Sequence, residues 1–243
     1  MTELRSRTRL RWLCALFGLA LAGCLATPTQ PAVIESTGTA RPPSPTAPAP
    51  TEQLTQELPG VTALGRAAGL RARLTSLLGE HVMLAAEATG AALAGREAEF
   101  EVAAGALDRN SIDLAAAIGS VYGPDIEGAF LPLWRTHIGF FADYTVAVGA
   151  DDATNRDFAV ADLLQYAKDF GAVLNSINPR LAKDAVAGLV EEHVSTLLGV
   201  IDAQAKGDLE GAYAATRLAY AHMSLIADAL AEGIVQQFPD EFR

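Results

Sequence analysis

Histidines are the residues with the most evident chemistry in this 243-residue sequence, and three of the four are evenly spaced. His81, His137 and His193 follow one another at equal intervals, and His222 lies nearer the end of the sequence. Neutral imidazole is a common ligand of zinc and copper, and helical bundles hold such ions between facing helices. The four histidines are therefore a candidate metal site.

The same spacing predicts partners for the histidines. All four lie among apolar residues, and a buried imidazole needs a hydrogen-bond partner. If the chain turns back near Gly95 and at the two equivalent places, a residue 14 before each turn faces a residue about 15 after it. The predicted pairs are His81 with Asn110, His137 with Tyr166, and His193 with His222.

Two interpretations of this polar layer remain open. In the first, which we favour, the histidines hydrogen-bond to these partners, or to Asp113 and Asp169 one helical turn further along, and so fix the register of the helices. This interpretation requires no cofactor. In the second, the same groups converge on a zinc or copper ion, and His193 and His222 form the nucleus of the site.

The histidines belong to a longer internal repeat. The 56-residue interval aligns three segments without gaps: LLGEHV (77–82), LWRTHI (133–138) and LVEEHV (189–194). Three units follow, at about residues 77–132, 133–188 and 189–243. Ala, Leu and Glu dominate these units, and around His81 the apolar residues recur at spacings of three and four, which is typical of amphipathic helices. The aromatic residues around His137, Trp134 among them, are expected to pack in the core.

Helix-breaking residues divide each unit into two helices. We expect breaks within and between the units at Gly95, 149–152, Gly207, 122–124 and 178–179. The sequence therefore predicts an all-α fold of about six long helices, arranged as three antiparallel hairpins packed as a bundle. Pro132 falls inside one of these helices, where the missing backbone N–H predicts a kink or a short separate helix.

The N-terminal residues form a different kind of segment. Four arginines precede an uncharged apolar stretch of 11 residues (12–22), which is too short to span a bilayer and typical of a signal peptide. The run Leu21-Ala22-Gly23-Cys24 ends this segment and resembles the lipobox of bacterial lipoproteins. The resemblance implies that residues 1–23 are removed, and that Cys24 becomes the N-terminus and carries acyl chains that anchor it in a membrane.

Residues 24–60 are predicted to be a disordered tether between this lipid and a folded domain. Eight of the twelve prolines fall there, among Thr, Ala, Ser and Gln, and such a composition cannot bury enough apolar surface to fold. Residues 61–243 are enough for one core and would form the helical-repeat domain. We expect a lipid-anchored protein of the cell membrane that faces the extracytoplasmic side, either in the periplasm or at the cell surface.

The charge of the chain excludes one class of partner. The sequence has 18 basic and 29 acidic side chains, and removal of a signal peptide with four arginines and one glutamate leaves 14 and 28, a net charge of −14. So acidic a chain has no basic surface with which to bind nucleic acid. Cys24 would be the only cysteine that remains, so no intrachain disulfide is expected.

Three runs of the helical part are EHVMLAAEA (80–88), IGSVYG (118–123) and LWRTHI (133–138). They resemble a helical domain found in secreted and surface proteins of bacteria, over about residues 66–240. Some members of that family are labelled copper amine oxidase, on account of a separate N-terminal module. An amine oxidase of that class needs a large β-rich catalytic domain, so the resemblance implies a helical fold and no catalytic residue.

The sequence thus predicts a membrane-anchored helical domain that binds a partner and is not an enzyme. Helical repeats create extended surfaces, and a long tether would let such a surface reach a protein or a small ligand. No nucleophile set, cofactor motif or informative pair of carboxylates supports catalysis. The alternative function is a lipoprotein that binds zinc or copper through the histidine layer.

Overall fold

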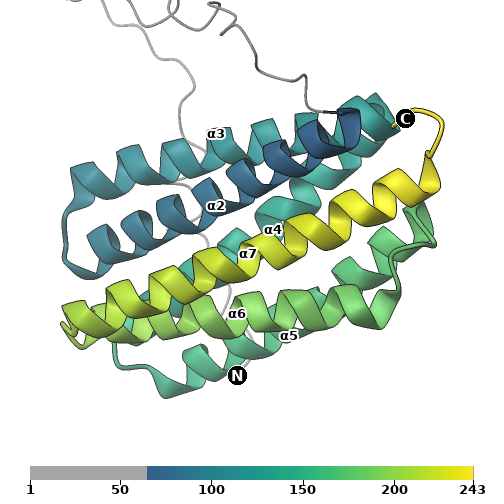
Figure 1. Cartoon of the computed structure of the whole chain (residues 1–243). Helices are drawn as coiled ribbons and strands as arrows, with labels where there is room; N and C mark the ends of the chain where they lie inside the picture. The colour runs from purple at the N-terminus through teal and green to yellow at the C-terminus, as the bar shows by residue number, and fades with distance from the viewer. Residues whose placement is uncertain (1–64, 243) are drawn as a thin grey trace, which may run out of the picture. The chain divides into compact units, whose positions relative to one another are not determined.

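The computed structural model describes residues 65–242, and these residues form six long helices and no strand (Figure 1). The prediction of an all-α fold is confirmed for this range. Cys24, the apolar stretch before it and the proline-rich segment lie outside the described residues. The helices are α2 (Arg66–Leu93), α3 (Glu97–Tyr122), α4 (Pro124–Gly149), α5 (Ala153–Ile177), α6 (Lys183–Ala205) and α7 (Leu209–Gln237).

Three tight turns of one design join the helices into hairpins, α2 with α3, α4 with α5, and α6 with α7. Each turn has one residue in the left-handed region, with φ of 67° at Gly95, 51° at Asp151 and 69° at Gly207. The N–H of the residue that follows bonds the carbonyl five residues earlier, which ends the first helix of the hairpin. These turns recur at the same interval as the histidines and lie at breaks predicted from the sequence.

Two of the hairpins also have the same kind of helix cap. Asp152 accepts a hydrogen bond from the N–H of Asn155, and Asp208, at the equivalent place in the next hairpin, accepts one from the N–H of Gly211. Each cap satisfies a backbone donor that has no partner within the helix. Arg96, at the corresponding place in the first hairpin, provides no side-chain cap.

The three hairpins close into a ring. Each helix packs against the next one in the chain, and α7 returns to pack along α2. The helices α2, α4 and α6 also contact one another, while α3, α5 and α7 each lie between two of them. The last hairpin packs against the first, so the ring has no open end.

Residues at the same place in the three hairpins meet along the centre of this ring. Leu78 of α2, Trp134 of α4 and Val190 of α6 occupy equivalent places in the repeat, and all three line one internal cavity. The cavity is also lined by equivalent residues of the three other helices, which are Leu114, Phe170 and Ile226. The 56-residue interval thus appears as an approximate threefold arrangement of helices. The division of the sequence into three repeat units stays a prediction.

Pro132 does not interrupt its helix. α4 runs from Pro124 to Gly149 without a break, so a short separate helix, one of the two predicted outcomes, does not form. Pro132 is exposed, and water can therefore satisfy the carbonyl group that loses its N–H partner.

Among the described helices, α7 alone has the length and the apolar composition of a membrane-spanning helix. A helix of a protein core meets the same criteria, and α7 packs against both α2 and α6. Its buried residues, such as Met223, Ala227 and Ile234, belong to the common core. We therefore describe α7 as part of the bundle.

Candidate metal centre

Three histidines from the three inner helices meet at the centre of the ring. His81 of α2, His137 of α4 and His193 of α6 are 1%, 3% and 3% exposed. The ring centroids are 5.4 Å apart for the first two, 5.8 Å for the first and third, and 6.1 Å for the last two. One nitrogen from each ring lies within 4.8 Å of the other two.

The sequence around each histidine turns its ring inward. Leu78 and Ala85, three residues before and four after His81, are buried on the same face of α2. Trp134 and Phe141 occupy the equivalent places on α4 and are buried as well. Because the inner helices run in the same direction, equivalent positions bring the three imidazoles to one height.

Hydrogen bonds do not satisfy this cluster. Nε2 of His137 lies 3.4 Å from Nε2 of His81, which is long for a hydrogen bond. Nδ1 of these two rings has no partner, and neither nitrogen of His193 has one. Four buried nitrogens are thus unsatisfied, and leaving such a group without a partner costs about 1–3 kcal/mol.

Burial keeps the three imidazoles neutral. Loss of hydration, with a smaller contribution from repulsion between the rings, lowers the pKa of His137 and of His193 to about 3 and that of His81 well below its ordinary value. The carbonyl of Trp134 partly opposes this effect at His137, although its placement falls short of a hydrogen bond. At neutral pH the cluster therefore offers unprotonated nitrogens, the form that binds metal ions.

The spacing of the nitrogens suits a small transition-metal ion. A tetrahedral site with zinc–nitrogen distances of about 2.0–2.1 Å separates two ligand nitrogens by about 3.3–3.4 Å. The observed separation of the Nε2 atoms of His81 and His137 is 3.4 Å. His193, with both nitrogens free, is close enough to supply a third ligand. Over residues 65–242 no other group of histidine, cysteine and acidic side chains meets the geometry for a metal ion.

The two aspartates of the predicted metal site lie elsewhere. Asp113 and Asp169 are exposed, and Asp169 accepts a hydrogen bond from Gln165. Their neighbours in the chain, Leu114 and Phe170, face the core instead. Asn110 and Tyr166 already lie at one edge of the buried face of their helices, so a residue three positions further on, turned by a further angle of about −60°, lies beyond that edge. Their prediction as ligands is wrong.

The predicted hydrogen bond between His81 and Asn110 is also wrong. The side-chain amide of Asn110 donates to the carbonyl of Leu77 at 3.0 Å and to the carboxylate of Glu80 at 2.8 Å. Asn110 is buried as predicted, but it binds the backbone of α2 and leaves His81 to face the other hairpins.

The third hairpin repeats this arrangement. Nε2 of His222 lies 2.8 Å from the carbonyl of Leu189, and these two residues occupy the places in their hairpin that Asn110 and Leu77 occupy in the first. His222 is therefore not the partner of His193, and it lies outside the cluster of three. The histidine that the sequence singled out as half of the nucleus has a structural hydrogen bond instead.

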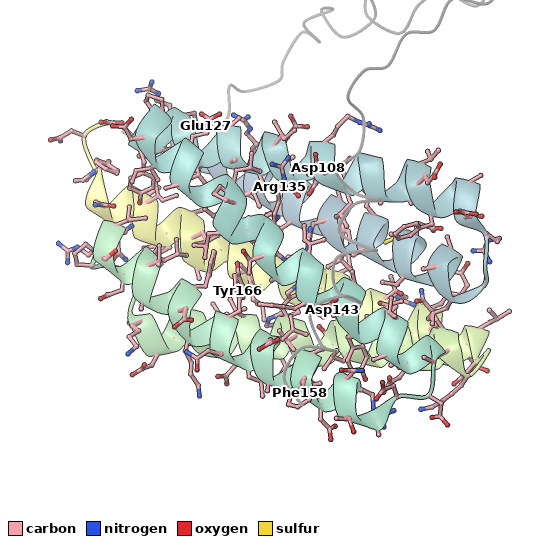
Figure 2. All side chains as sticks on the ribbon, turned by 180° about the vertical axis from the view of Figure 1, so that it is seen from behind. Asp108, Glu127, Arg135, Asp143, Phe158 and Tyr166 are labelled. Carbon is pink, nitrogen blue, oxygen red and sulfur yellow. The ribbon has the colours of Figure 1, made fainter. Side chains whose placement is uncertain are left out.

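Two aromatic residues with unpartnered donors flank the cluster. Tyr166 lies at mid-length of the bundle on α5 (Figure 2), with its ring 5.2 Å from that of His137. This contact agrees with the predicted pair, but the buried Tyr166 hydroxyl has no partner, in contrast to its counterparts Asn110 and His222. The ring of Trp134 lies 4.6 Å from that of His137, and its Nε1 has no partner either. In the sequence, the signal for a place of Trp134 beside the cluster was its position three residues before His137.

A partly buried group of polar side chains elsewhere in the bundle is satisfied. The hydroxyl of Tyr122 donates to Gln237 at 2.8 Å and accepts from Asn178 at 3.1 Å, and Gln237 donates to the carbonyl of Ile177 at 3.0 Å. Over residues 65–242 the buried side-chain atoms without a partner belong to the three histidines, to the flanking Tyr166 and Trp134, and to Oδ1 of Asn110. Unsatisfied buried groups with shifted pKa values are typical of ligand sites.

Comparison of the chain with family models, with curated proteins and with solved structures gives no match.

Proposed function

We propose that this protein is an extracytoplasmic, lipid-anchored metal-binding protein, whose helical domain holds one transition-metal ion through His81, His137 and His193. One observation carries the proposal: equivalent places on α2, α4 and α6 bring three buried imidazoles together, and four of their nitrogens have no partner. A bound ion would take one nitrogen of each ring as a ligand: Nε2 of His81, Nε2 of His137 and one of the two unpartnered nitrogens of His193.

A purely structural role explains the cluster less well. Leucine has a similar size and occurs at many neighbouring core positions, such as Leu74, Leu78 and Leu197. It would fill the centre without an unsatisfied polar group and without an imidazole that must stay neutral. The cluster is thus unfavourable to the folded state unless a ligand occupies it.

Zinc and copper are the ions that suit this donor set. Both accept three imidazole nitrogens, whereas magnesium and calcium prefer oxygen ligands, and no carboxylate belongs to the cluster. In many metal sites a carboxylate or carbonyl accepts a hydrogen bond from the second nitrogen of each histidine and strengthens binding about 10–100-fold. Here Nδ1 of His81 and of His137 has no such partner, so we expect weaker binding than at supported sites.

The sequence supports the location of the site. Four arginines, a short apolar stretch and the run Leu21-Ala22-Gly23-Cys24 are typical of a lipoprotein signal, and a lipid on Cys24 would hold the domain on the outer side of a membrane. In that place the domain would meet metal ions before they enter the cytoplasm.

Metal titration of the purified protein tests the proposal. Zinc or copper added to metal-free protein should bind with a stoichiometry of one and raise the melting temperature, because a ligand of the native state alone stabilises it by about 2.7 kcal/mol at 100 times its dissociation constant. The stoichiometry is measured by elemental analysis after dialysis.

Two variants locate the ion. His193→Leu removes one proposed ligand and should abolish both the bound metal and the rise in melting temperature. His222→Gln is the matched control, because it removes a histidine outside the cluster and keeps a donor for the carbonyl of Leu189. Binding that persists in His193→Leu, or that is lost to the same extent in His222→Gln, rejects the proposed site.

Partner binding is a second candidate function, which the surface of α7 favours. Leu209, Tyr213, Leu218 and Leu225 are all more than half exposed, and exposed apolar groups gather at interaction sites. A photo-crosslinker placed at Ala221 should capture one partner in cells. The variant Leu218→Lys with Leu225→Lys should remove that product without a change in melting temperature. The same products in both proteins would contradict this role.

A further inference from the structure

We infer that the ion in this site carries a small anion as its fourth ligand, and that Tyr166 and Trp134 donate hydrogen bonds to that anion. The inference rests on the proposed metal site and names the class of ligand that the site would take: a monovalent anion of up to about three atoms.

The proposed site has no negative charge of its own. A divalent ion held by three neutral imidazoles would bring two positive charges into an apolar core, and a buried charge without a partner is costly. No acidic or cysteine side chain belongs to the cluster. The glutamates adjacent to two of the histidines in the sequence, Glu80 and Glu192, are both exposed, and Glu80 accepts a hydrogen bond from Asn110. An anion from solution would supply the missing negative charge.

Two donors without acceptors lie beside the cluster. The side chains of Tyr166 and Trp134 are 5% and 7% exposed, and neither the O–H of the first nor the N–H of the second has an acceptor. Their rings lie 5.2 Å and 4.6 Å from that of His137. An anion bound to the ion would be an acceptor beside both rings, and hydrogen bonds to a charged group are stronger than those to a neutral one.

The space beside the cluster has the size of a small anion. An internal cavity of about 40 Å³ is lined by His137, His193, Tyr166 and Trp134, together with apolar residues of the central layers. A water molecule needs about 10–15 Å³ of such volume, so two or three atoms would fit. On the other side the ring of Phe141 lies 5.8 Å from that of His193 and closes the site. The open position of a bound ion would therefore face the cavity.

The surface exposed to this cavity is apolar, because the polar atoms of Tyr166 and Trp134 are fully buried, and an anion would therefore bind only with the ion in place. An apolar cavity of this size stays dry and gives an anion no reason to enter. With the ion in place, a water molecule or hydroxide would occupy the fourth position until another anion replaced it.

Azide binding to the full chain loaded with cobalt(II) tests the inference. Cobalt takes the place of zinc, and its visible absorption changes when a ligand in its coordination sphere is replaced. Azide should cause a saturable change with a stoichiometry of one, and the larger acetate ion should cause none. Tyr166→Phe should weaken azide binding about 10–100-fold, through the loss of one hydrogen bond to a charged group.

Two further variants complete the design. Tyr144→Phe is the matched control, because its hydroxyl donates to Asp202 at 2.8 Å and does not line the cavity; azide binding should not change. Trp134→Phe removes the second donor and keeps an aromatic ring, so it should also weaken azide binding. Circular dichroism checks that each variant keeps its helical content.

The possible outcomes distinguish the metal site from the bound anion. Protein that binds no cobalt would overturn both. Protein that binds cobalt but does not respond to azide would overturn the present inference and leave the metal site intact. The inference also fails if Tyr166→Phe and Trp134→Phe both bind azide as the wild type does. A cobalt spectrum that changes in Tyr166→Phe before any azide is added, with no response to azide in wild type, would identify Tyr166 itself as the fourth ligand.

Discussion

Acid should destabilise the metal-free protein well above the pH at which carboxylates titrate. The pKa values of His81, His137 and His193 are far below 6.5 in the folded state because the rings are buried, whereas an imidazole of the unfolded chain has a pKa of about 6.5. Between these values the unfolded chain binds more protons than the folded one. The free energy of unfolding therefore falls as the pH falls below about 6.5, and it is unaffected by these groups above about pH 7.5.

The size of this effect follows from the number of buried rings. At pH 5.5 each imidazole of the unfolded chain is about 90% protonated, so three of them take up about 2.7 protons on unfolding. The free energy of unfolding should then change by about 3.7 kcal/mol per pH unit, and it should fall by about 4 kcal/mol between pH 7 and pH 5.5. Domains of this size are stable by about 5–15 kcal/mol, so acid near pH 5 should remove a large part of that stability.

Urea unfolding followed by circular dichroism, in the presence of a chelator, measures this dependence. The slope against pH gives the number of protons taken up, and His193→Leu should lower it by about one near pH 5.5. His222→Gln should leave the contribution of the cluster intact. Uptake of less than one proton by wild-type protein at pH 5.5, or an unchanged slope in His193→Leu, would refute the view that these rings are held neutral.

Further predictions concern packing, backbone strain and the anchor. Gly171→Ala should lower the free energy of unfolding by about 1–3 kcal/mol, because a Cβ there would lie 2.5 Å from the carbonyl oxygen of Lys183. Gly188→Ala has open space around the new Cβ and should raise the free energy of unfolding by about 0.5–1 kcal/mol. Urea unfolding measures both changes. Asp151→Gly should raise the free energy of unfolding by about 1 kcal/mol, because a left-handed φ of 51° strains a residue with a side chain. An unchanged free energy of unfolding would show that the turn is unstrained. Cys24→Ser should leave the protein unprocessed or release it from membranes, and a variant still acylated by mass spectrometry would contradict the lipid anchor.

The helices could be predicted because their ends depend on local chemistry. Gly95, Gly207 and the segment 149–152 mark the hairpin turns in the sequence, and the structure places left-handed residues there. The burial of His81, His137 and His193 could also be predicted, because their neighbours at spacings of three and four are apolar.

The site could not be predicted because it depends on how the hairpins are arranged. A 56-residue interval is compatible both with an open array and with a ring, and only the packing of α7 along α2 decides between them. In an open array the side chain of His137 would face Tyr166 of its own hairpin, as predicted. In the ring the same apolar face of α4 also meets α2 and α6, and this brings His137 to His81 and His193.

The closed ring brings the two ends of the described chain together, since α7 packs along α2 and a guanidinium N–H of Arg66 donates to the carbonyl of Glu241 at 2.9 Å. The arrangement of the helices in space therefore does not depend on which hairpin comes first in the chain. A circular permutant that starts at Pro124, with residue 242 joined to residue 66 by a short linker, would keep every helix beside its present neighbours. Such a chain should fold to the same bundle and assemble the same three histidines, although the order of the hairpins along the chain is changed.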